Sequence, residues 1–333
     1  MIQEIEVKSF NEVIEEIDYG LKLGDDKRLE KAVFNFAKSC EPGAVLFLLD
    51  LLSKSETCEY AIIALGILGD TRAVKHLEDY LYHSNLYIRR YAAQALGRIA
   101  SKHSVDPLID TLTDKEDIVL MVVVRALGDI NDRRAVKPLI NLMHSAHYNV
   151  IGVVAEILGK LGDERAIEPL ISTIHIKHPS ATKKVITALG KFRNNPRVVD
   201  VLINCLSNLD YHRNCYAANA LGEIGDERAI ESLIDVLLTE TEFSNLCAAE
   251  SLVRYGSHVA LEPLIKALKH PEESIRERAA YALGQLSDKR AIEPLVNTLH
   301  DEDEFARFNA KVALVKIDKD TDWEALIGSQ WNK

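Results

Sequence analysis

The sequence predicts an all-α fold, an α-α superhelix in which about nine helical hairpins of 31 residues stack side by side. Three observations indicate this solenoid: a short motif that recurs at a constant period, apolar residues at helical spacing within each period, and glycine and proline at fixed places in the repeat. A hairpin of two such helices cannot bury its own apolar face, so neighbouring hairpins are expected to cover one another.

The motif is Ala-Leu-Gly or a close variant of it. "ALG" begins at positions 64, 95, 126, 188, 220 and 282, "ILG" begins at 157, "SLV" at 251 and "ALV" at 313. Consecutive copies are 31 residues apart, except for a spacing of 32 between 188 and 220. A constant period of this length marks a repeat protein, so the 333 residues are expected to form one array and not two ordinary domains.

Each repeat is predicted to hold two helices. In residues 275–286, apolar residues recur three and four positions apart on one helix face, and a second stripe follows over 292–299. Recurring "GD" pairs between the two stripes offer glycine for a left-handed helix end and aspartate to cap the next helix. Proline is tolerated only in a first helical turn, so the second helix is expected to begin two to four residues before the prolines at 107, 138, 169, 263 and 294.

The two ends of the chain depart from the repeat. Residues 1–43 have helical character but match the motif weakly, and we expect them to form an N-terminal cap on a repeat array over 44–317. Residues 318–333, "DKDTDWEALIGSQWNK", are polar with one amphipathic turn and are expected to form a C-terminal cap. Caps of this kind shield the terminal apolar faces of a solenoid.

Composition excludes several classes of function. The formal net charge of −11 and the pI near 5.5 give no basic surface for nucleic acid, whose binding depends on neutralising phosphates. The N-terminus lacks a signal-peptide pattern, and the longest apolar run, "IVLMVVV" at 118–124, is too short to span a membrane. We therefore expect a soluble, cytoplasmic protein. Its five cysteines form no CxxC pair, so free thiols in a reducing compartment are expected.

The repeat unit resembles a known family. The pattern R-x-x-A-A-x-A-L-G-x-I/L-G-D-x-R-A-I-x-P-L-I, which residues 89–109, 214–234 and 276–296 follow with departures at individual positions, is similar to HEAT-like repeats of the phycobilisome (bilin) lyase type. Its first position holds Arg89, Arg276 and Arg307, whereas Asn214 takes that place in another copy. The resemblance implies that the helix carrying the motif lines the concave surface of the solenoid.

Helical geometry then selects the residues of this groove. Positions one, four, five, eight and nine residues before the motif lie roughly opposite the buried stripe. The candidate ligand-binding residues of the groove are Tyr87, Arg90, Tyr91, Gln94, Arg125, Tyr148, Glu156, Lys184, Tyr211, Cys215, Asn219 and Tyr281. An aromatic and cationic groove suits a large planar anionic ligand, and the same residue types also serve as anchors for a protein partner.

The resemblance implies a bilin lyase or bilin-transfer chaperone, which would attach a linear tetrapyrrole to a cysteine of a phycobiliprotein subunit, either alone or with a second lyase subunit. The tetrapyrrole is then a substrate, and no permanently bound cofactor is expected. The best catalytic constellation is a carboxylate, Asp210, with His212 and Tyr216 for proton transfer on the same helical start. The alternative is a non-catalytic scaffold that binds a protein in the groove.

A metal enzyme is the third class of function. Deoxyhypusine hydroxylases have similar repeats and bind iron through His-Glu dipeptides, but no histidine of this chain is followed by glutamate. The pairs His144 and His147, and His175 and His178, lie at expected junctions between helices, where solvated polar turns are common. We therefore expect no metal site.

Overall fold

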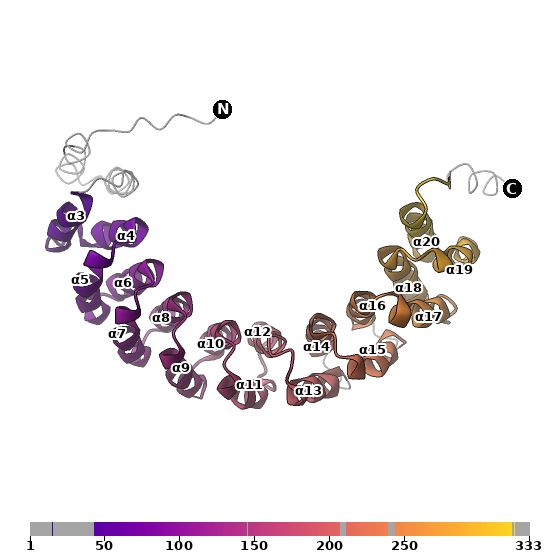
Figure 1. Cartoon of the computed structure of the whole chain (residues 1–333), viewed down its shortest axis with the longest axis horizontal. Coiled ribbons are helices and arrows are strands. Elements are labelled where there is room, and N and C mark those ends of the chain that lie inside the picture. Colours follow the sequence, from indigo (N-terminus) through magenta and orange to yellow (C-terminus); the bar gives the residue numbers. More distant parts are fainter. Residues whose placement is uncertain are drawn as a thin grey trace. The chain divides into compact units, whose positions relative to one another are not determined.

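The structure is a computed structural model that describes residues 15, 43–144, 146–206, 211–238, 244–321 and 323; all regular elements in this part of the chain are helical (Figure 1). The chain divides into two compact units, Met1–Pro169 and Leu170–Lys333, although helix α11 (Ile167–Thr173) spans this division. The expected caps lie almost wholly outside the described residues, so the domain boundaries at 43/44 and 317/318 remain predictions. Among the described residues, no helix is long and apolar enough to cross a membrane.

The first unit is a stack of helical hairpins that follows α3 (Ala44–Leu52) (Figure 1). The helices that carry the motif, called first helices below, are α4 (Cys58–Leu68), α6 (Leu86–Ile99), α8 (Asp117–Ile130) and α10 (Tyr148–Leu161). The second helices are α5 (Val74–Asp79), α7 (Val105–Asp110), α9 (Val136–Met143) and α11. Two of them continue as short 3-10 helices, η2 (Tyr80–Tyr82) and η4 (Thr111–Thr113).

The second unit repeats this arrangement. Its first helices are α12 (Pro179–Leu189), α14 (Tyr211–Ile224), α16 (Ser244–Tyr255), α18 (Glu273–Leu286) and α20 (Glu304–Ile317). Its second helices are α13 (Pro196–Leu206), α15 (Ile230–Leu237), α17 (Ser257–Ala267) and α19 (Ile292–Thr298). In each unit, successive first helices pack against one another in one layer, and the second helices form the other layer (Figure 1). The predicted all-α repeat fold is confirmed.

The turn chemistry is also as predicted in the three repeats that carry a "GD" pair between their two helices. Gly69, Gly162 and Gly225 end their helices with φ of 71°, 65° and 77°, in the left-handed region that glycine adopts at no steric cost. The aspartate that follows each of them accepts a hydrogen bond from the backbone N–H two residues later, as Asp70 does from Arg72 at 2.9 Å. This bond opens a short 3-10 turn from which the second helix continues.

Four of the five prolines lie where the sequence places them. Pro107, Pro138, Pro169 and Pro294 each follow the first residue of a second helix by two positions. The prediction is wrong for Pro263, which lies inside α17, six residues after Ser257. The reason is local: "GSHVA" replaces the "GDxRA" turn here, so α17 begins directly after Gly256, without the usual 3-10 turn.

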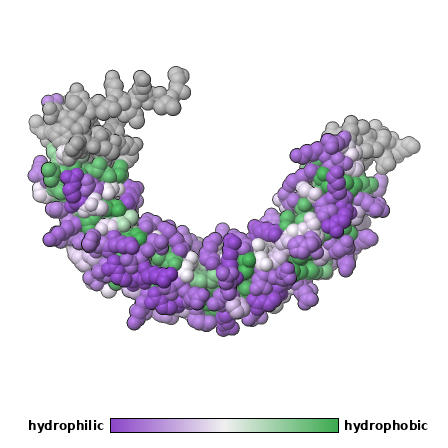
Figure 2. Space-filling view, viewed as in Figure 1, coloured by the Kyte–Doolittle hydropathy of each residue, from purple (hydrophilic) through white to green (hydrophobic). Residues whose placement is uncertain are grey.

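The motif is repeated because its two small residues meet across the stack. A Cβ atom built on Gly66 would lie 2.7 Å from Cα of Ala95, one on Gly97 would lie 2.8 Å from Cα of Ala126, and Gly284 meets Ala313 in the same way. The glycine of one first helix thus packs against the first alanine of the next motif. The leucine between them is fully buried in all nine motifs, while the visible surface of the units is mostly hydrophilic (Figure 2).

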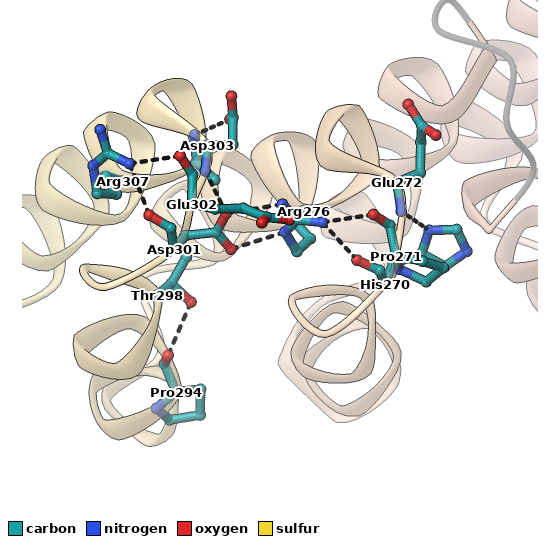
Figure 3. Close-up of polar contacts among 11 residues, drawn as sticks. His270, Pro271, Glu272, Arg276, Pro294, Thr298, Asp301, Glu302, Asp303 and Arg307 are labelled. Carbon is teal, nitrogen blue, oxygen red and sulfur yellow. Dashed lines mark hydrogen bonds and ion pairs between the residues drawn. The ribbon is translucent and has the colours of Figure 1, made fainter.

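The repeat arginine forms a second kind of link between successive repeats. Arg276 donates to both carboxylate oxygens of Asp301 at 2.8 and 2.9 Å, and to the carbonyl oxygens of His270 and Pro271 (Figure 3). It therefore joins the turn before α18 to the turn before α20. Arg89 does the same with Asp114 and the carbonyls of His83 and Ser84 in the first unit.

We expect the glycine of the motif to tolerate no larger residue. Gly97→Ala places a methyl group against the backbone of α8, which cannot rotate away, and should lower the free energy of unfolding by about 1 to 3 kcal/mol in urea denaturation. Gly190→Ala is the matched control, because its nearest neighbour is a side-chain atom at 3.2 Å. Equal effects of the two substitutions would contradict the close approach.

Asp301→Ala should cost about 3 kcal/mol of unfolding free energy, because it leaves the buried Arg276 without its partner. Burial raises the pKa of Asp301, but hydrogen bonds from Arg276 and from the N–H of Asp303 outweigh it and hold the pKa below its ordinary value. The stabilisation is therefore present above the ordinary pKa and is lost as the pH falls through the lowered one. Asp106→Ala is the control, because Asp106 forms an exposed pair with Arg134, and it should cost less than about 1 kcal/mol of unfolding free energy. A similar loss in both variants would contradict a stabilising role of the buried pair between Arg276 and Asp301.

Candidate functional site

In each unit the first helices lie on the inner side of that unit's own curve (Figure 1), with their second helices on the outer side. Their small and apolar residues pack against neighbouring helices, which leaves one side of each first helix towards solvent. We call this side the first-helix face. Three positions that geometry assigns to it, Gly152, Val153 and Cys247, are buried instead.

In the first unit, α6 places an arginine between two tyrosines. The guanidinium carbon of Arg90 lies 5.6 Å from the ring centroid of Tyr87 and 4.5 Å from that of Tyr91, distances typical of cation–π contacts. Tyr87 is 52% exposed and Gln94 is exposed on the same helix. This arrangement forms a rigid aromatic and cationic surface.

The other candidates of this unit lie on α8 and α10. Arg125 and Glu156 occupy the same position of successive motifs, and their side chains approach to 3.8 Å while remaining about half exposed. Tyr148, at the start of α10, is 51% exposed. An exposed pair of this kind contributes little to stability.

In the second unit, α12 and α14 form a similar aromatic and cationic surface. The rings of His212 and Tyr216 stack with their centroids 6.4 Å apart, and Nζ of Lys183 lies 5.8 Å from the Tyr216 centroid. Lys184 on α12 and Tyr281 on α18 are partly exposed. Sequence reasoning selected Lys184 for the groove, whereas its neighbour Lys183 makes the contact with Tyr216.

The expected catalytic constellation is described only in part. Asp210 and the side chain of Tyr211 lie outside the described residues. His212 and Tyr216 are brought together, but the carboxylate that would act with them is not placed, so the assignment of Asp210, His212 and Tyr216 remains a prediction. Among the described residues, no group of three or more His, Cys, Asp or Glu side chains is arranged to hold a metal ion.

The expectation of free thiols is wrong for two of the five cysteines. Cys215 on α14 and Cys247 on α16 form a disulfide, with their Cα atoms 5.2 Å apart. Cys58 and Cys205 are free and buried, and Cys40 lies outside the described residues. Burial raises the pKa of the Cys205 thiol to about 11, which makes it a poor nucleophile. Cys215 is thus a half-buried residue of the first-helix face whose sulfur belongs to a disulfide. Nδ2 of Asn219 lies 3.7 Å from this sulfur.

A pocket of about 380 Å³ lies where α16 meets α18. The motif of α16 is "SLV", so Val253 stands where other first helices carry the glycine of close approach. Val253 and Ala282 line the pocket together with Glu250, Arg254, Tyr281 and Gln285. Arg254 also donates to the backbone oxygen of Asn219 at 3.3 Å. A valine at this position explains the space, because it keeps the two helices from the contact that glycine allows.

Sequence reasoning missed an apolar stripe on α20. Phe305, Phe308, Val312 and Val315 are 58, 63, 46 and 45% exposed and follow one another at intervals of three and four residues. The first three occupy the positions eight, five and one residues before the motif, so the register used for the other repeats would have found them.

The first-helix layer also differs from the rest of the chain in charge. The nine first helices carry 14 Lys and Arg against 9 Asp and Glu, whereas the whole chain carries 40 against 51. The excess of acidic residues therefore lies outside these helices.

Comparison with known proteins shows the family. Residues 80–153, 136–214, 174–253 and 261–330 match the model of the HEAT repeats. These matches cover more than half of the chain, which therefore belongs to the HEAT repeat family. No curated protein sequence matches the chain significantly.

Three solved structures are similar at low identity. They are an engineered protein (20% identity, 92% of this chain and 98% of that chain, TM-score 0.45), the complex of CpcE and CpcF of phycocyanin lyase from Nostoc sp. PCC7120 (21%, 66% and 92%, 0.42) and human deoxyhypusine hydroxylase in complex with glycerol (18%, 75% and 97%, 0.35). At these scores the likenesses carry no argument about function.

Proposed function

We propose that the chain is a non-catalytic scaffold that binds an acidic protein through the first-helix faces. The observation that carries the proposal is the distribution of exposed large apolar side chains among the described residues. Seven of the ten lie on first helices: Tyr87, Ile118, Tyr148, Phe305, Phe308, Val312 and Val315. Exposed aromatic residues of this kind are typical anchors of protein interfaces.

Charge supports an acidic partner. Lysine and arginine exceed aspartate and glutamate on the first helices of a chain that is acidic as a whole. A surface of one sign attracts a partner of the opposite sign and raises the rate of association. The Arg90 cluster with Tyr87 and Tyr91 combines both features, because arginine and tyrosine are enriched at interface hot spots.

Photo-crosslinking tests the scaffold directly. A photoreactive phenylalanine at Tyr87, Tyr148 or Phe308 should capture the same acidic protein in the cells that make the chain. Tyr87→Ala combined with Tyr148→Ala should then weaken binding of that protein at least about tenfold, measured by calorimetry, because two exposed anchors are lost.

Tyr82 provides the matched control, because it is 61% exposed but lies on η2, the continuation of a second helix, and not on a first helix. The same photoreactive group at Tyr82 should capture nothing specific, and Tyr82→Ala should leave affinity unchanged. Capture from position 82 alone would contradict the proposed face.

We propose bilin transfer as the second candidate, on a different observation. Lys183, Tyr216 and His212 form one aromatic and cationic platform on α12 and α14, which suits stacking of a planar linear tetrapyrrole with its carboxylates towards lysine. The repeat also resembles that of bilin lyases. Under this proposal the acidic partner is a phycobiliprotein subunit, the final bilin acceptor.

Titration with a linear tetrapyrrole tests this candidate. Binding should shift its visible absorption, and Tyr216→Ala should weaken binding at least about tenfold by removing the stacking surface. Asp210→Asn should weaken it if the carboxylate stabilises protonated pyrroles, while Tyr82→Ala should have no effect. An unchanged absorption spectrum at saturating protein would contradict the proposal of bilin transfer and would leave the scaffold proposal unaffected.

A further inference from the structure

The interface between α14 and α16 differs from its counterparts in how it is linked. At the position of the repeat arginine, these two helices carry Asn214 and Asn245, which are 8% and 0% exposed. The side-chain oxygen of Asn214 and both amide atoms of Asn245 have no hydrogen-bond partner. At the position where α6 and α18 carry Arg89 and Arg276, these two helices therefore carry unpaired amides.

Unpaired buried amides destabilise these two helices. Each buried polar group without a partner costs the free energy of removing it from water, about 1 to 3 kcal/mol. The disulfide between Cys215 and Cys247 crosses the same pair of helices and closes a segment of 32 residues in the sequence. A covalent link here offsets the loss that the asparagines cause, so the interface depends on whether the disulfide is present.

The two sulfurs differ in their accessibility. Cys215 is half-buried on the first-helix face, whereas Cys247 is 7% exposed. The other described cysteines, Cys58 and Cys205, are buried free thiols. Because they are buried, they are not expected to take part in exchange with the disulfide. An external thiolate can therefore reach the bond from one side, through Cys215.

We propose that Cys215 and Cys247 form a site of reversible thiol–disulfide exchange, acted on by dithiol and disulfide reagents, that controls the stability of the interface between α14 and α16. In reduction, a thiolate of the dithiol attacks Sγ of Cys215, and Cys247 leaves as a thiolate that takes up a proton. The second thiol then attacks the reagent's own sulfur in the mixed disulfide, which releases Cys215 as a thiol and the reagent as a cyclic disulfide. Oxidation by a disulfide is the reverse, so two electrons and two protons balance in each direction.

Thiol labelling in the native state tests the site. Equilibration with oxidised dithiothreitol should leave Cys215 and Cys247 unlabelled by a maleimide, and equilibration with reduced dithiothreitol should expose both together, Cys215 first. Cys58 and Cys205 should remain unlabelled in both conditions, as mapped by mass spectrometry. Labelling of Cys215 and Cys247 to the same extent in both conditions would overturn the proposal.

Hydrogen exchange tests the consequence for the interface. Reduction should speed exchange in α14 and α16 by about tenfold or more and leave α6 and α8 unchanged. The Cys215→Ser variant should show the exchange rates of the reduced chain in both oxidised and reduced dithiothreitol. Cys205→Ala is the control, and its exchange rates in α14 and α16 should still rise on reduction.

A second variant removes the cause of the weakness. Asn245→Leu replaces the unpaired amide by an apolar group of similar shape, so it should shrink the effect of reduction on α14 and α16 several-fold. Hydrogen-exchange rates in α14 and α16 that do not change when the unsubstituted chain is reduced would overturn the proposal. These measurements need no protein partner and no tetrapyrrole, so their outcome is independent of the proposed function.

Discussion

The close contact between the glycine of one first helix and the alanine of the next determines the rest of the fold. Gly66 and Ala95, Gly97 and Ala126, and Gly284 and Ala313 leave no room for a larger side chain. This contact fixes the side on which first helices join. Their large and polar residues are thereby directed to the opposite side, which makes the first-helix face a consequence of packing.

The contact varies along the chain, and each variation has a structural effect. Ser251 replaces alanine opposite Gly222 and satisfies its hydroxyl by donating to the carbonyl of Ala218 at 2.8 Å. Val253 replaces glycine and lines the pocket between α16 and α18. Val315 replaces glycine on α20 and is 45% exposed, in an exposed apolar stripe that the other first helices of the described residues do not carry. Two of these departures, Val253 and Val315, thus mark places where the surface differs between repeats.

Features set by neighbouring residues could be predicted from the sequence. Helical periodicity, the left-handed glycines and the capping aspartates depend on a few adjacent positions, and Pro263 was misplaced because its turn sequence is different. Contacts between repeats were predicted less well. The disulfide joins residues 32 positions apart, and the pair Arg125 and Glu156 is 31 apart, so a search for reactive or charged pairs within one residue of the repeat spacing would have found both.

The chemistry of the candidate site could be predicted only in outline. The register placed Tyr87, Arg90 and Tyr216 on the exposed face, but helical geometry cannot tell which neighbouring side chain reaches an aromatic ring. Lys184 was selected from the sequence, whereas Lys183 makes the contact with Tyr216. Nor does the register show that a valine in place of glycine opens a pocket. Such features depend on how two helices approach each other, which a single repeat does not contain.

The most direct test of the account is the accessibility of adjacent residues on a first helix. Single cysteines at Gln94 and Ala95, and at Glu250 and Ser251, should be labelled with a maleimide in the native state and quantified peptide by peptide. The account predicts fast labelling at 94 and 250 and strong protection at 95 and 251, because the latter side chains are 2% and 0% exposed. Equal labelling within either pair would contradict the packing on which the first-helix face depends.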